Sequence, residues 1–103
     1  MGFSAGAQFV GRYAFANPQQ VKKCAIIASG GNDKITSHVG VKFFYGIGYN
    51  DASNRREFAN TFEKEAAKYN IDVVKKVYAG TGHTLTQGMQ DDVREFFKSK
   101  SKK

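Results

Sequence analysis

The chain has 103 residues, of which 41% are hydrophobic and 14% aromatic, and its formal net charge is +7. This length allows one domain with a single core, and the apolar content is typical of a folded chain rather than a disordered one. The sequence has no apolar run near the roughly 20 residues that span a membrane. No basic segment followed by an apolar stretch marks a signal peptide, so we expect a cytoplasmic protein if Met1 is the natural start.

The positive charge is concentrated at the end of the chain. The closing KSKSKK, residues 98–103, contributes four charges, so the remaining body carries only +3. We therefore expect a single domain over residues 1–97, followed by a solvated basic tail. A nucleic-acid-binding protein would need a basic face with interleaved aromatic side chains on its body, so we expect no nucleic-acid partner.

The chain opens with GFSAG, residues 2–6, which fits the pattern G-x-S-x-G. In one large enzyme class this pattern forms a sharp turn between a strand and a helix, and the turn exposes its serine as a nucleophile. Helix-tolerant residues follow until Pro18 prevents the helix from continuing, and Val10, Tyr13, Ala14 and Asn17 lie near helical spacing. These features predict one helix over residues 5–17.

Three segments further along have the length, the apolar content and the flanking glycines of buried strands. They are residues 21–29, 41–48 and 70–80. An amphipathic helix is predicted over residues 53–70, because one face carries Phe58, Phe62, Ala66 and Tyr69. A closing helix is predicted over residues 86–99 from the helical spacing of Met89, Val93, Phe96 and Phe97.

Strands that alternate with helices indicate the α/β class, with a parallel sheet and right-handed crossovers. In such sheets the functional side chains gather at the carboxyl ends of the strands. Ser4 lies at the opening turn, Asp51 follows the second predicted strand and His83 follows the third. A nucleophilic serine needs a base to take its proton, and a histidine base needs a carboxylate to orient it. These residues supply all three groups.

Each of the three residues also has a purely structural explanation. The opening pattern occurs by chance among small residues, Asp51 or Ser53 would cap the helix that follows, and His83 would be a solvated loop histidine. Asp33 is a second candidate for the acid, because it too follows a strand. We choose Asp51 because its strand is adjacent to the strand that precedes His83.

The nucleotide and metal motifs in the sequence are incomplete. In GIGYND, Asp51 stands where the third glycine of G-x-G-x-x-G belongs, and no G-x-x-x-x-G-K-[ST] run occurs. His38 and His83 are far apart in the sequence, and Cys24 is the single cysteine. Since Cys24 lies in an apolar run, we expect a buried, inert thiol there. We expect neither a cofactor nor a metal ion.

With these motifs the sequence resembles the C-terminal half of an α/β-hydrolase. The resemblance is carried by GFSAG running into a helix, by FFYGIGYND, and by VYAGTGHT before a terminal helix. Within the superfamily the chain is most similar to esterases related to polyhydroxybutyrate depolymerases and feruloyl esterases. The resemblance implies a serine hydrolase of small-molecule carboxylic esters, with Ser4 as acyl nucleophile, His83 as general base and then acid, and Asp51 as its orienting carboxylate. The backbone N–H of Ala5 would be one oxyanion-hole donor.

The same resemblance implies an incomplete fold. In the family the nucleophile elbow follows the fifth strand, so we expect a partial sheet of about three parallel strands with flanking helices, without the first five strands. The loop that supplies the second oxyanion donor would also be missing. The predicted strand 21–29 would have an open apolar edge, so we expect self-association or a complementary chain that carries the N-terminal half. The alternative is an inactive hydrolase remnant that serves as an interaction or structural module.

Overall fold

The computed structural model of the chain describes residues 2–29, 35 and 37–98. Its strands are β1 (Gly2–Phe3), β2 (Lys23–Ile27), β3 (Lys42–Gly48) and β4 (Val73–Tyr78). Its helices are α1 (Ala5–Ala16), α2 (Ser53–Lys68) and α3 (Gln87–Lys98). None of the helices in these ranges is long and apolar enough to cross a membrane.

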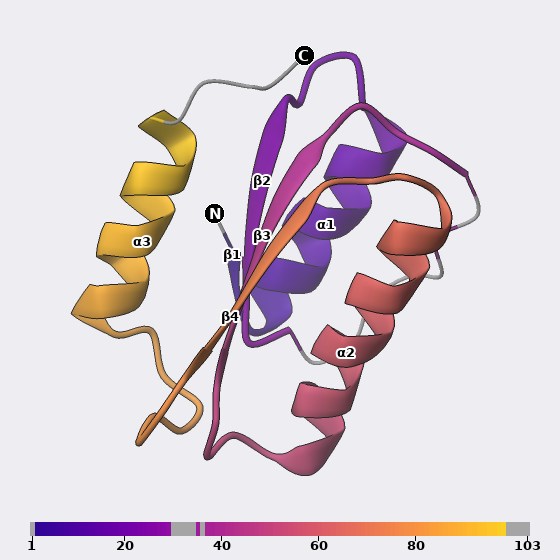
Figure 1. Cartoon of the computed structure of the whole chain (residues 1–103). Coiled ribbons are helices and arrows are strands. Elements are labelled where there is room, and N and C mark those ends of the chain that lie inside the picture. Colours follow the sequence, from indigo (N-terminus) through magenta and orange to yellow (C-terminus); the bar gives the residue numbers. More distant parts are fainter. Residues whose placement is uncertain (1, 30–34, 36, 99–103) are drawn as a thin grey trace.

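The strands form one parallel sheet in the order β1-β2-β3-β4. Helices α1 and α2 cover one face of the sheet and α3 covers the other, so the molecule has three layers (Figure 1). Each crossover brings the chain back to the same end of the sheet, and the carboxyl ends of all four strands therefore lie along one edge. This architecture confirms the predicted α/β class with flanking helices.

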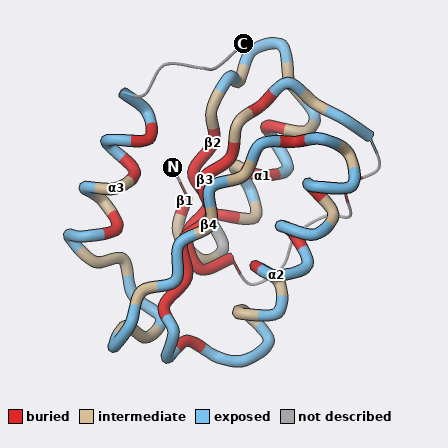
Figure 2. The backbone as a smooth tube through the Cα atoms, viewed as in Figure 1, coloured by how far each residue is buried: buried red, intermediate tan, exposed pale blue. Residues whose placement is uncertain are grey.

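The core is built on the two central strands. Figure 2 shows β2 and β3 as the most continuously buried part of the chain, and Ile26, Phe43 and Tyr45 are fully inaccessible. Because helices lie on both faces of the sheet, both sides of these strands are buried, which explains their unbroken apolar runs. Strand β4 is an edge strand, and its side chains alternate between half-buried and exposed.

The sheet has one strand more than the sequence indicated. Gly2 pairs with Ile26 and Phe3 with Ile27, which adds β1 beside β2. Two residues are too short to give a period-2 pattern, so only their partners in the folded chain identify them as a strand. The expected open edge of β2 is therefore partly covered, and it is the segment from Lys23 to Ala25 that has no partner in β1.

The helices lie where the sequence placed them, but two aromatic side chains point elsewhere. Helix α1 contacts the sheet through small residues, including the fully buried Ala7 and Ala14, whereas Tyr13 is exposed. In α3, Met89, Val93 and Phe96 are buried, and Phe97 is exposed. Small side chains let α1 approach the sheet closely, and Phe9 and Tyr13 face outward, whereas Phe15 near the end of the helix stacks on Phe43 of the sheet.

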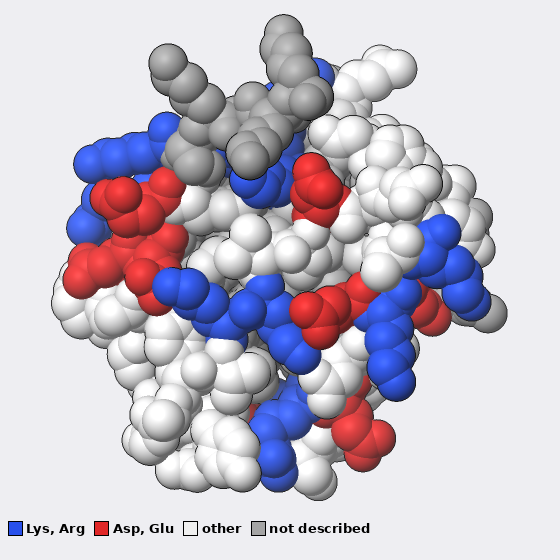
Figure 3. All heavy atoms as spheres, in the orientation of Figure 1, with Lys and Arg blue, Asp and Glu red and all other residues white. Residues whose placement is uncertain are grey.

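Basic and acidic side chains are interspersed over the face of the molecule shown in Figure 3. Among the described residues, some charged side chains form surface pairs, such as Lys76 with Asp92 and Arg94 with Asp91. The lysine-rich residues 99–103 and the loop 30–34, which contains Asp33, lie outside the described residues. The division into a domain and a basic tail stays a prediction.

Candidate active site

Ser4 lies at the junction between β1 and α1 with a backbone conformation that few residues other than glycine adopt. Its φ is 57° and its ψ is −119°, a combination that costs about 1–3 kcal/mol and persists only where surrounding contacts impose it. Those contacts are visible: the Ser4 N–H donates to the Ile27 carbonyl at 2.9 Å, and the Ser4 carbonyl accepts from the Ala7 N–H at 3.0 Å. The strained turn carries the serine hydroxyl on the strand-to-helix corner.

The two glycines around Ser4 have different roles. A Cβ atom at Gly2 would lie 2.3 Å from the Gly6 carbonyl oxygen, so the strand and the helix approach too closely there for any side chain. A Cβ atom at Gly6 would meet nothing within 4 Å. The sharp corner therefore depends sterically on Gly2, while Gly6 is open to the space outside the described chain.

Asp51 lies in the loop between β3 and α2, and its side chain is fully buried. Its Oδ1 atom accepts hydrogen bonds from the Ala52 N–H and from Arg55 Nε, both at 2.7 Å, and its Oδ2 atom faces His83 Nδ1 at 2.9 Å. Burial opposes ionisation, but the hydrogen bonds from His83, Arg55 and Ala52 outweigh it, so the pKa of Asp51 lies below its ordinary value. The carboxylate is therefore held as an anion.

The N-cap role considered for Asp51 and Ser53 is not observed. Helix α2 begins at Ser53 with Ala52 at its N-cap, and no side chain makes a capping hydrogen bond. The Asp51 side chain instead points toward the loop between β4 and α3. The carboxylate contacts the start of α2 through the Ala52 N–H and Arg55 Nε and reaches His83 with its other oxygen, so its partners in the site explain its position better than helix capping does.

His83 is brought to the other two residues by close contact between two loops. A Cβ atom at Gly48, the last residue of β3, would lie 2.2 Å from the Thr81 carbonyl oxygen, so only glycine lets the His83 loop pack over this strand end. The Asn50 N–H donates to the same Thr81 carbonyl at 2.8 Å. The Phe3 ring lies against the imidazole, with 5.0 Å between ring centroids.

The structure brings the three predicted side chains into one hydrogen-bonded row. His83 Nε2 lies 3.0 Å from Ser4 Oγ, and His83 Nδ1 lies 2.9 Å from Asp51 Oδ2. Because an ionised carboxylate only accepts, Nδ1 carries the proton that is donated to Asp51, and Nε2 is left to accept the serine hydroxyl. This is the geometry in which an imidazole can take a proton from a serine during attack on a carbonyl group.

Ala5, the predicted oxyanion donor, is the first residue of α1. The first N–H groups of a helix have no partner within the helix, and the helix dipole favours negative charge at this end. The backbone of Ala5 thus directly follows the serine at a position suited to an oxyanion.

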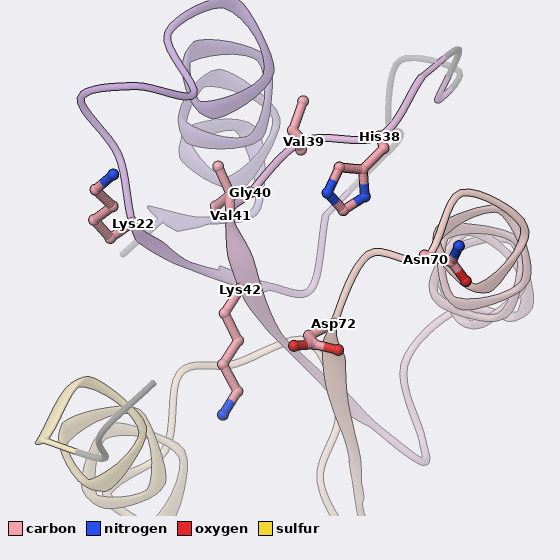
Figure 4. A pocket seen from close by; sticks show the side chains of 8 residues that line it. All are labelled: Lys22, His38, Val39, Gly40, Val41, Lys42, Asn70 and Asp72. Carbon is pink, nitrogen blue, oxygen red and sulfur yellow. The ribbon is translucent and has the colours of Figure 1, made fainter. Parts of the chain in front are cut away.

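The remaining polar candidates lie away from this row. His38 Nδ1 lies 2.8 Å from the Tyr69 carbonyl oxygen and lines a hollow of about 180 Å³ near the amino ends of β2, β3 and β4 (Figure 4). His83 is at the opposite ends of the strands, so the two histidines cannot share a metal. Among the described residues, no group of three or more His, Cys, Asp or Glu side chains could hold a metal ion.

Cys24 is buried, as predicted, and burial raises its pKa to about 11. It is the second residue of the central strand β2, near its amino end and away from the carboxyl ends of the strands. Its thiol stays protonated over the physiological range, so it is an inert packing residue.

Sequence reasoning missed two residues that shape the site. Arg55 binds the Asp51 carboxylate, and Phe3 supports the His83 ring. Arg55 could have been noticed, because it lies four residues after Asp51 at the start of a helix, where a cation is unfavourable unless a nearby anion holds it. Phe3 gave no signal, since its neighbour in the fold is 80 residues away in the chain.

Comparisons with known proteins support the fold. No family model matches the sequence, and no curated protein matches it. Among solved structures, the crystal structure of esterase PE8 superposes with a TM-score of 0.62 and 24% sequence identity, over 93% of this chain and 46% of that one. The chain thus spans less than half the length of that esterase. The likeness shows that this chain shares the α/β fold of part of that esterase, while the resemblance to α/β-hydrolases, and within them to polyhydroxybutyrate depolymerases and feruloyl esterases, stays a prediction.

Proposed function

We propose that this chain supplies the catalytic residues of a serine hydrolase that cleaves carboxylic esters through an acyl-enzyme. The observation that carries the proposal is the position of His83, whose two ring nitrogens lie 3.0 Å from Ser4 Oγ and 2.9 Å from Asp51 Oδ2. The strained backbone of Ser4 adds support, because such a conformation is typical of functional turns. The esterase fold of the solved neighbour is consistent with the same chemistry.

In the proposed mechanism, Ser4 Oγ attacks the ester carbonyl carbon while His83 Nε2 takes the hydroxyl proton. Asp51 stabilises the imidazolium that forms. The tetrahedral intermediate then collapses, the C–O bond to the alcohol breaks, and His83 donates its proton to the leaving oxygen. In the second half of the reaction, His83 deprotonates a water molecule that attacks the acyl-Ser4 carbonyl carbon. The bond to Ser4 Oγ then breaks, His83 returns the proton to that oxygen, and the acid leaves.

The negative charge of the tetrahedral intermediate would be stabilised by the backbone N–H of Ala5. An oxyanion hole normally has two donors, and loss of one costs about 2.7–4 kcal/mol of transition-state stabilisation, or 10²- to 10³-fold in rate. We propose that a second chain completes the site. This chain would be another copy of the protein or a complementary polypeptide.

The surface beside β1 suits such an association. Phe9 is 67% exposed and Tyr13 is 45% exposed. Both line a mainly apolar hollow of about 280 Å³ that reaches Cys24 on the part of β2 without a β1 partner. An incoming strand would extend the sheet and bury these side chains. The proposed substrate is a small-molecule ester, and the mechanism uses no cofactor.

The test of the proposed function is covalent labelling with a fluorophosphonate probe, followed by peptide mapping. We expect the adduct on Ser4 and its loss in Ser4→Ala. Ser53→Ala is the matched control, because Ser53 begins α2 and its hydroxyl does not belong to the row formed by Ser4, His83 and Asp51. This variant should be labelled like the wild type. An adduct elsewhere, or none in a folded sample in any assembly, would favour the inactive interaction module over the enzyme.

A further inference from the structure

Arg55 is bound to the candidate acid by an interaction that the proposed reaction does not require. Its Nε lies 2.7 Å from Asp51 Oδ1, shorter than the 2.9 Å between Asp51 Oδ2 and His83 Nδ1. The Arg55 side chain is 29% exposed, whereas the Asp51 side chain is fully buried. One carboxylate therefore shares its charge between a permanent cation and the imidazole.

The position of Arg55 is unfavourable for the helix that carries it. It lies in the first turn of α2, which contains no acidic residue, although the dipole favours anions at this end and disfavours cations. Arg55 therefore does not stabilise the helix. Its contact with the buried Asp51 carboxylate explains its position better than helix stability does.

The geometry indicates two effects on His83. Arg55 and the Ala52 N–H both bind Oδ1, so together they fix the rotation of the carboxylate and direct Oδ2 toward the imidazole. The guanidinium charge also offsets part of the carboxylate charge that stabilises a protonated imidazole. Arg56 also faces this loop, but its Nε donates to the main-chain oxygen of Asp51 at 3.2 Å rather than to the carboxylate.

We propose that Arg55 is a positioning residue that fixes the Asp51 carboxylate against His83 and offsets part of the negative charge that the imidazole faces. The proposal rests on the proposed hydrolase function for its catalytic meaning. Its physical content, a charge coupling from Arg55 through Asp51 to His83, does not depend on that function. Ser4 and Phe3, which also contact the imidazole, carry no charge.

The test follows the His83 ring by NMR as the pH is varied in the full chain. In Arg55→Gln the carboxylate charge is no longer offset, so we expect the midpoint of the His83 titration to move to higher pH than in the wild type. Arg55→Lys keeps the charge and should remain near the wild type. Arg55→Met is a second neutral variant if Arg55→Gln does not fold.

Arg56→Gln is the matched control, because it removes the same charge from the next residue without touching the carboxylate. Its His83 midpoint should move much less than that of Arg55→Gln, and the ring of the remote His38 should titrate alike in all variants. Equal movement in Arg55→Gln and Arg56→Gln, or no movement in either neutral Arg55 variant, would overturn the inference.

Activity provides a second, separate readout. In whichever assembly hydrolyses esters, the acid limb of the kcat/KM profile should move to higher pH in Arg55→Gln, by the same interval as the NMR midpoint. If Ser4 proves unreactive, the proposed function fails while the NMR coupling is still measured. If the coupling is absent in an active enzyme, the role of Arg55 fails and the hydrolase stands.

Discussion

Asp51 is the residue on which the row of side chains depends most directly, because its charge orients His83 and stabilises the imidazolium. In Asp51→Asn the amide can donate to His83 and so favour the tautomer that cannot accept the serine proton. We expect ester hydrolysis to fall by up to about 10⁴-fold, the size of the effect in a well-studied serine protease. The measurement is the hydrolysis rate in the active assembly, with folding checked by circular dichroism.

Asp33→Asn is the comparison for this prediction. Asp33 was the competing candidate for the acid, and it lies outside the described residues, whereas the Asp51 carboxylate is 2.9 Å from His83. We expect Asp33→Asn to change the rate little. Loss of activity in Asp33→Asn with activity kept in Asp51→Asn would reassign the acid.

The ionisation of Asp51 also predicts how stability depends on pH. Its pKa is below its ordinary value in the folded chain, because hydrogen bonds from His83, Arg55 and Ala52 outweigh the opposing effect of burial. At a pH between the folded and the unfolded pKa of Asp51, the unfolded chain binds the proton more readily than the folded chain. The contribution of Asp51 to stability is therefore complete above the ordinary Asp pKa of about 3.9 and is lost as the pH falls through the lower folded value.

Urea unfolding between pH 2 and pH 7 measures this dependence. We expect the stability difference between the wild type and Asp51→Asn to be largest in the upper part of this range and to shrink below about pH 4. Asp91→Asn is the control, because Asp91 pairs with Arg94 on the exposed surface and such pairs contribute little. A difference that stays constant down to pH 2 would contradict the prediction.

Among the elements, β3 positions the site through its last residue. The His83 loop packs directly on Gly48, where a Cβ atom would lie 2.2 Å from the Thr81 oxygen and 2.5 Å from the Gly82 oxygen. Gly48→Ala must displace this loop, and we expect it to lower the free energy of unfolding by about 1–3 kcal/mol and to move His83 away from Asp51. Urea unfolding and the His83 NMR signals measure the two effects.

Gly82→Ala tests the same loop with the same chemical change. A Cβ atom at Gly82 would meet nothing within 4 Å among the described residues, so its stability should stay within about 0.5 kcal/mol of the wild type. Equal destabilisation by both substitutions would show that the loop tolerates no side chain and that the contact with Gly48 has no special role.

Taken as one body, the molecule has an open apolar region beside β1. Phe9 and Tyr13 project from α1 next to the part of β2 without a β1 partner. We expect the chain to associate through this region, since burial of apolar surface contributes roughly 25 cal/mol per Å². Sedimentation over a concentration series is the measurement, and a monomer of 11.4 kDa at every concentration would contradict the prediction.

Two substitutions localise the association. Phe9→Glu places a charge in the apolar hollow and should shift the equilibrium toward the monomer. Phe97→Glu is the matched control, because Phe97 is also exposed but belongs to α3, on the other face of the sheet (Figure 1). An equal effect of both variants would move the interface away from β1.

Much of this protein can be predicted from its sequence, because the relevant signals are local. Apolar runs of strand length predicted the strands β2, β3 and β4, and the helical spacing of apolar residues predicted all three helices, within a few residues. The alternation of these elements predicted a parallel sheet, and a parallel sheet places its carboxyl ends along one edge. That is why the sequence alone predicts that Ser4, Asp51 and His83 lie together.

Other features depend on contacts between distant segments, and only the tertiary structure decides them. β1 is a strand because Ile26 and Ile27 pair with it, and Gly48 must be glycine because the loop before His83 packs against it. The outward orientation of Tyr13 depends on how closely α1 approaches the sheet, and the ionisation of Asp51 depends on both Arg55 and His83. Sequence patterns report what each segment favours by itself, whereas a steric contact or a shared hydrogen bond exists only once both partners are in place.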